Sequence, residues 1–138
     1  CTARAAVTRR PAPTPRIATA AEVIQLDVPL ASDAVEQEIA RHLSLLRGVD
    51  GVAAASDVIA MAAMRVLADH AIRVPEDVAV IGFDDLPLAT QTVPRLTTVR
   101  QDIAGGARVM VSTLFARLAG DDTAATVMMP VLCPRDSA

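Results

Sequence analysis

The sequence has neither tryptophan nor tyrosine, and its two phenylalanines keep the aromatic share at 1% of 138 residues. Only Phe83 and Phe115 could therefore stack on a sugar ring or a base. The core must be aliphatic, but with 52% hydrophobic residues it can still be sizeable. The length is that of one domain of ordinary size.

Long apolar runs and an excess of positive charge are also missing. No run approaches the ~20 residues of a membrane helix, so no membrane partner is expected. A net charge of −3 argues against direct contact with nucleic acid, which requires a basic surface. The first ten residues carry three arginines and no apolar segment follows them, so no signal peptide is predicted.

Cysteine is nearly absent as well. Cys1 and Cys133 form neither a disulfide framework nor a metal-ligand spacing. We expect no metal site and no cofactor, and this cysteine content suits a reducing cytoplasm.

The most informative stretch is 74–85, which reads Val-Pro-Glu-Asp-Val-Ala-Val-Ile-Gly-Phe-Asp-Asp. Its apolar run at 78–81 is rich in β-branched residues and predicts a strand buried on both faces, as in parallel sheets. Gly82 is predicted to end the strand and to allow a sharp turn. Asp84 and Asp85 then lie just past the strand's carboxyl end, where ligands bind in open α/β sheets.

Apolar periodicity predicts the other elements. Strands are expected at 22–28, 50–55, 96–101 and 126–133, and helices at about 33–48, 58–71 and 103–119, with a loop or short helix at 86–93. Pro130 interrupts the last strand, which indicates an edge strand. The alternation predicts an α/β fold with a doubly wound, mainly parallel sheet and helices on both faces.

Four motifs together resemble the effector-binding core of LacI/GalR-type bacterial transcriptional repressors. They are the stretch 74–85, Pro-x-Leu-Thr-Thr-Val-Arg-Gln at 94–101, Ala-Ser-Asp at 55–57 and Arg-Asp-Ser at 135–137. The resemblance implies a periplasmic-binding-protein-like fold and a cytoplasmic, dimeric repressor that senses a small metabolite, a sugar or a purine-like molecule. Operator DNA would be bound only through an N-terminal helix-turn-helix that this sequence does not contain.

The resemblance also divides the chain. Residues 1–21 would be a partly ordered lead-in segment, and 22–94 the C-terminal effector-binding subdomain. Residues 95–120 would be a crossover strand and helix that belong to a first subdomain absent here, and 121–138 a returning edge strand and tail. Without that subdomain, the apolar stripe of the helix at 103–119 is expected to pack against a second copy of the chain.

The resemblance implies three ligand-binding residues: Asp84, Ser56 and Arg4. The family's first aspartate of the pair, here Asp84, accepts hydrogen bonds from the effector, and an ionised acceptor makes short, strong bonds. Ser56 stands where the family often has asparagine, and Thr-Ala-Arg at 2–4 resembles the place where an arginine reaches the effector. The proline-rich run at 11–15 departs from the helix that the family has there.

Each of these residues also has a structural interpretation. Aspartates readily form turns, Ser56 could cap the following helix, and Arg4 could be a solvated side chain of the lead-in segment. Acid–base catalysis by Asp84 and Asp85 is not expected, because no third catalytic partner is evident.

The dimer interface is expected at Met61, Met64 and Thr92. The helix at 58–71 is apolar almost all round, so it should be buried against more than its own sheet. The family places the position of Met61 against the partner subunit. The alternative is a well-covered internal helix.

Two other classes of function fit the sequence less well. A secreted sugar-binding protein of a transport system shares the fold, but Val-Pro-Glu-Asp-Val at 74–78 and the crossover motif at 96–101 favour the repressor. An α/β enzyme would need a nucleophile–base pair or a phosphate loop, and neither is present in the sequence, so no enzymatic activity is expected.

Overall fold

The computed structural model describes residues 2–8, 23–29 and 32–138. Its elements are β1 (Thr2–Thr8), β2 (Val23–Pro29), α1 (Ser32–Arg41), α2 (Leu43–Leu46), β3 (Gly51–Ala54), α3 (Asp57–Asp69), β4 (Ala79–Ile81), the 3-10 helix η1 (Pro87–Thr90), β5 (Thr98–Arg100), α4 (Ile103–Leu118) and β6 (Val131–Cys133). No helix in the described ranges is long and apolar enough to cross a membrane. The α/β class predicted from the sequence is confirmed.

A four-stranded sheet in the order β2-β1-β3-β4 forms the centre of the fold. The predicted strands at 22–28, 50–55 and 78–81 are confirmed as β2, β3 and β4, and β3 and β4 are parallel. The sequence did not predict β1, which runs antiparallel to both β2 and β3. Its small residues have weak strand propensity, and pairing on both sides provides the hydrogen bonds that stabilise it.

The helices α1 and α3 pack side by side on one face of this sheet, α1 over β2 and α3 over β3 and β4. Aliphatic side chains from both layers form the core, as the composition requires. Sequence patterning predicted helices on both faces, whereas in the described residues the opposite face leaves Ala53 exposed and Ile81 half-buried. The single helix predicted at 33–48 is two helices, because the chain turns at His42.

An antiparallel ribbon of β5 and β6 continues from the free edge of β4. The amides of Gly82 and Val80 donate to the carbonyls of Thr97 and Ser137, which ties the base of the ribbon to β4. β6 is shorter than predicted, since 126–130 runs beside α4 without strand pairing.

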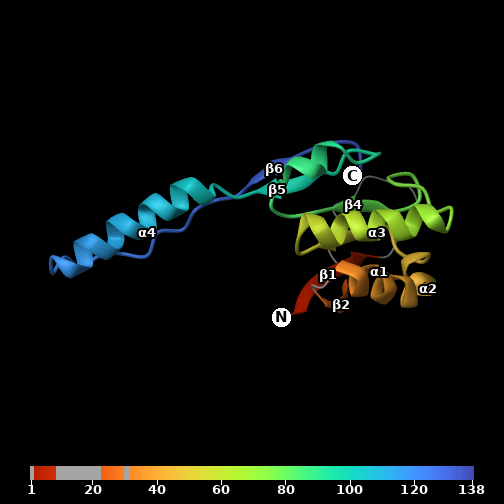
Figure 1. The fold of residues 1–138 in the computed structure, drawn as a ribbon, viewed down its shortest axis with the longest axis horizontal. Coiled ribbons are helices and arrows are strands. Elements are labelled where there is room, and N and C mark those ends of the chain that lie inside the picture. The colour runs from red at the N-terminus through yellow and green to blue at the C-terminus, as the bar shows by residue number, and fades with distance from the viewer. Residues whose placement is uncertain (1, 9–22, 30–31) are drawn as a thin grey trace.

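The helix predicted at 103–119 is confirmed as α4, and it points away from the sheet (Figure 1). Its apolar side chains are in solvent: Met110 is 73% and Leu118 74% exposed.

Candidate functional site

The carboxyl ends of β3 and β4 form the candidate site. Because the two strands are parallel, the segments that follow them, 55–57 and 83–86, lie at the same edge of the sheet. The amide of Asp57 donates to the carbonyl of Phe83 at 2.8 Å and joins the two segments directly.

The Asp57 carboxylate is a structural anchor. It is fully buried and accepts hydrogen bonds from the amide of Leu86 at 2.7 Å and from Oγ1 of Thr98 at 2.5 Å. It thus connects the start of α3, the loop after β4 and the start of β5. Both its oxygens are occupied and shielded from solvent, so Asp57 cannot contact a ligand.

The Asp85 carboxylate is also occupied. Nε of Arg100 donates to one oxygen at 2.6 Å, and Arg135 forms an ion pair with the other. The hydrogen bond from Arg135, and then that from Arg100, holds the pKa of Asp85 below its usual value. These contacts keep the carboxylate ionised and fixed in orientation.

Asp84 differs from both. Its side chain is half-buried, and within the part of the chain that the structure describes it has no cationic partner. Its pKa is raised, mainly by partial burial and then by the nearby carboxylate of Asp57, while a hydrogen bond from the Gln101 side chain opposes the shift. Asp84 is therefore the carboxylate of this edge that is available to a neutral or cationic ligand.

Ser56 caps α3, as one of its two interpretations predicted. Its Oγ accepts from the amide of Ile59 at 3.4 Å, a long bond, and its backbone is extended. The hydroxyl proton is not used in that bond, so it can still be donated to a ligand.

Arg4 lies on β1, opposite Asp27 of β2. Ala5 is opposite Ala54, the last residue of β3. The strand register therefore brings the backbone of Arg4 to the edge where Ser56 lies.

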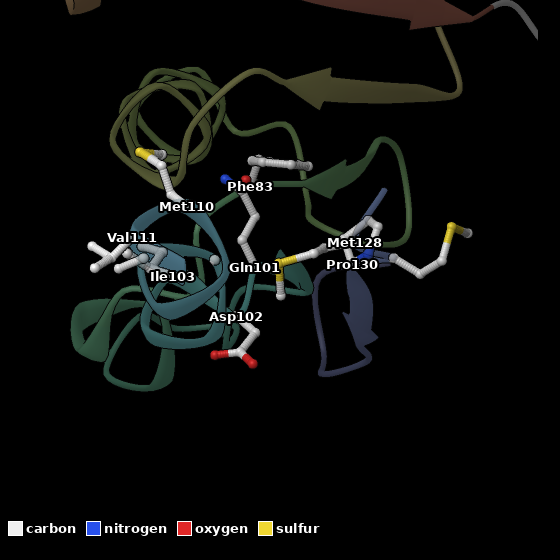
Figure 2. Close-up of a pocket in the computed structure, with 11 residues that line it drawn as sticks. Phe83, Gln101, Asp102, Ile103, Met110, Val111, Met128 and Pro130 are labelled. Carbon is white, nitrogen blue, oxygen red and sulfur yellow. The ribbon is translucent and has the colours of Figure 1, made fainter. Parts of the chain in front are cut away.

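A hollow of about 640 Å³ opens beside this edge. Gln101 and Phe83 form one wall, and the opposing walls come from α4 and from the returning segment at 128–130 (Figure 2). Gln101 lines this hollow, and its side chain is hydrogen-bonded to Asp84. Gln101 was not among the ligand-binding residues predicted from the sequence. Its position as a polar residue at the end of a predicted strand could have indicated a site residue. In the sequence, however, Gln101 contributed only to the family motif at 94–101.

The three predicted interface residues lie in different environments. Met61 and Thr92 are half-buried, whereas Met64 is only 7% exposed and belongs to the core of the chain. Apolar side chains that sequence reasoning did not single out are exposed in the same segments: Val58 is 45%, Leu88 56% and Val93 97% exposed.

In the described ranges, no group of three or more His, Cys, Asp or Glu residues could hold a metal ion. Cys133 is a free thiol.

Comparison with known proteins places these features in a family. Residues 4–138 match the model of the periplasmic binding protein-like domain. The transcriptional regulator MalR of Streptomyces coelicolor is 35% identical over 83% of this chain and 38% of its own length. The structure of a CelR–cellobiose complex is 35% identical with a TM-score of 0.71, over 80% of this chain and 35% of that one.

A LacI family regulator from Arthrobacter sp. FB24, solved with lactose, is 30% identical with a TM-score of 0.67, over 80% of this chain and 42% of that one. The chain thus spans less than half the length of these regulators, and it matches their C-terminal effector-binding region. The family and the fold predicted from the sequence motifs are confirmed. The chain belongs to the periplasmic-binding-protein-like domain family, in the form found in LacI/GalR-type transcriptional regulators.

Proposed function

We propose that this chain is the effector-sensing and dimerisation portion of a cytoplasmic LacI/GalR-type repressor and has no enzymatic activity. A small polyhydroxylated ligand binds at Asp84, with Ser56, Gln101 and Arg4 as further contacts. The full-length repressor binds operator DNA through an N-terminal helix-turn-helix, and the ligand changes that affinity. Such coupling between sites is typically ~1–3 kcal/mol.

One observation carries the proposal: among the described residues, Asp57 and Asp85 have both carboxylate oxygens occupied by structural partners, whereas Asp84 meets the neutral side chain of Gln101 and no cation. Asp57 holds α3 to β5, and Asp85 holds two arginines. A partly desolvated carboxylate beside the Gln101 amide, at the edge where Ser56 also lies, suits a ligand that offers several hydroxyl donors. The cellobiose and lactose in the two related structures support a sugar over a purine-like ligand.

Dimerisation is proposed through the exposed side of α3 and the segment around η1. Met61 and Thr92 would contact the partner, and Met64 would support Met61 from the core. The exposed Val58 and Leu88 favour this surface, because apolar groups concentrated on a soluble domain usually mark an interface. A secreted transport protein is not favoured, since the relatives named above are transcriptional regulators.

Titration calorimetry with a panel of mono- and disaccharides that includes cellobiose and lactose tests the proposal. Asp84→Asn should weaken binding of the best sugar about 10- to 100-fold, because a hydrogen bond to a charged group contributes ~1.5–3 kcal/mol. Asp122→Asn, an exposed change in the loop after α4, is the matched control and should bind like the parent. The proposal fails if no sugar binds the parent, or if Asp84→Asn and the control bind equally well.

The pH dependence of binding gives a second readout. Partial burial and the Asp57 carboxylate raise the pKa of Asp84, so this group takes up a proton at a higher pH than an ordinary aspartate does. Sugar affinity of the parent should therefore fall on acidification while most carboxylates are still ionised. Asp84→Asn should lose that step, because its amide does not titrate in this range.

A further inference from the structure

We propose that Asp85 is a positioning residue of the site: its contacts with Arg135 and Arg100 hold Asp84 in place and couple it to the β5–β6 ribbon. The effect of Asp85 on ligand binding rests on the proposed function, whereas its effect on the position of Asp84 follows from contacts within the chain.

The loop after β4 has an unfavourable backbone. Asp84 and Asp85 have φ angles of 117° and 54°, in the region that residues other than glycine rarely adopt. Such residues are unfavourable and persist only where their surroundings hold them. Strain of this kind, in two consecutive residues beside a candidate site, requires contacts that fix the loop.

Asp85 provides those contacts on one side. Its carboxylate binds Arg100, the last residue of β5, and Arg135, two residues after β6. Sγ of Cys133, on β6 itself, lies 3.7 Å from the same carboxylate. The Asp85 amide donates to Oγ1 of Thr98 at 3.3 Å. One residue of the loop therefore contacts both strands of the ribbon.

The two arginines are not equivalent. The Arg135 side chain is 14% exposed and also donates to the carbonyl of Leu96 at 2.7 Å, whereas the Arg100 side chain is 59% exposed. Solvent screens an exposed ion pair much more strongly than a shielded one. Arg135 is therefore the principal partner, and Arg100 adds a weaker contact to the other strand.

Asp84 is held to the same ribbon through its backbone. Its amide donates to the carbonyl of Val99 at 2.9 Å, in the middle of β5. A ligand that displaces Asp84 must therefore move β5, or else break this bond and the contacts of Asp85. The ribbon leads directly to α4 (Figure 1).

Hydrogen exchange by NMR in the ligand-free chain tests the positioning. In the parent, local opening of the loop must break the ion pairs of Asp85 with Arg100 and Arg135. Asp85→Asn removes that cost, so the Asp84 amide should exchange about tenfold faster. The matched control is Asp136→Asn, which removes another aspartate–arginine pair of the C-terminal segment, with Arg95 at 2.7 Å, where both side chains are about half exposed. The core amide of Leu67 should exchange at the parent rate in both variants.

Sugar affinity tests the coupling. Asp85→Asn should weaken the best sugar of the panel about tenfold, and Asp136→Asn should leave it unchanged. Arg100→Gln breaks only the exposed contact and should preserve the fold. It should speed exchange of the Asp84 amide by a smaller factor than Asp85→Asn, so the proposal stays testable even if Asp85→Asn does not fold.

The outcomes separate the two proposals. Equal exchange of the Asp84 amide in Asp85→Asn and Asp136→Asn overturns the positioning role, whatever binds. Faster exchange at Leu67 by the same factor as at Asp84 also overturns it, since the effect is then global. If the Asp84 amide exchanges faster in Asp85→Asn but the best sugar binds that variant as tightly as the parent, the proposed effect of Asp85 on ligand binding is overturned. A parent that binds no sugar refutes the proposed function, while the exchange data still decide the role of Asp85.

Discussion

Replacing Gly82 by alanine tests how tightly the site is built around Asp57. A Cβ at position 82 would collide with Oδ1 of Asp57 and would lie 3.0 Å from Cδ2 of Leu96 and 3.3 Å from Cβ of Ala60. Leu96 and Ala60 are fully buried. The φ of Gly82 is not in the left-handed region. Glycine is needed at this position because a Cβ would not fit, and not because of its backbone conformation.

The magnitude follows from what must move. Inserting a methyl group into a packed interior costs ~1–3 kcal/mol. If the Asp57 carboxylate shifts to make room, it weakens its bonds from Leu86 and Thr98, and a bond to a charged group contributes ~1.5–3 kcal/mol. We therefore expect Gly82→Ala to lower the free energy of unfolding by about 3–5 kcal/mol, a large part of the 5–15 kcal/mol typical of a domain.

Urea denaturation followed by far-UV circular dichroism measures this loss. Gly48→Ala is the matched control, because a Cβ there would meet only the carbonyl oxygen of Leu45, at an ordinary 3.5 Å. It should be neutral, or stabilising by up to about 1 kcal/mol. If the free energies of unfolding of the two variants differ by less than about 1 kcal/mol, the surroundings of Gly82 can make room for a methyl group, and the rigid packing around Asp57 is refuted.

Two further predictions concern surfaces. Met61→Asp should shift the oligomer toward monomer in light scattering, because a carboxylate desolvated in an apolar interface without a partner costs several kcal/mol; an unchanged mass would place the interface elsewhere. In α4, amide exchange should be slow at high protein concentration and fast on dilution to the monomer. The helix points away from the sheet with Met110 and Leu118 exposed, so a second copy is needed to cover them. Slow exchange of α4 in the dilute monomer would refute this.

Periodicity was enough to predict most of the elements but not all of their lengths. The strand at 78–81 and the helix at 103–119 are dense in apolar residues at one repeat, so local patterning identifies them. β1 carries the pattern Thr-Ala-Arg-Ala-Ala-Val-Thr, which favours no repeat strongly. It is a strand because β2 and β3 pair with it from both sides, and that pairing is a property of the assembled sheet.

The candidate site shows the same limit at the level of single residues. Asp84 and Asp85 follow one another at a strand end and have the same side chain, so only the family resemblance, and no property of the residues themselves, singled out Asp84 in the sequence. The structure separates them through Arg135, which lies fifty positions farther along the chain and pairs with Asp85 alone. Gln101 likewise reaches Asp84 because β5 lies beside the loop after β4. Only the fold brings these partners together.

In the loop after β4, the left-handed backbone does not occur at the glycine, where it is usually expected. A glycine at a strand end ordinarily indicates a left-handed turn, yet here the left-handed residues are Asp84 and Asp85, and Gly82 makes room for Asp57. Glycine at position 84 would relieve strain but would remove the carboxylate, and glycine at 85 would remove the contact with Arg135. The chain therefore keeps side chains where the backbone disfavours them, and the hydrogen bonds of Asp57 and Asp85 offset the cost. Strain held in this way beside the proposed site supports the proposal that Asp84 contacts the ligand while Asp85 holds it in place.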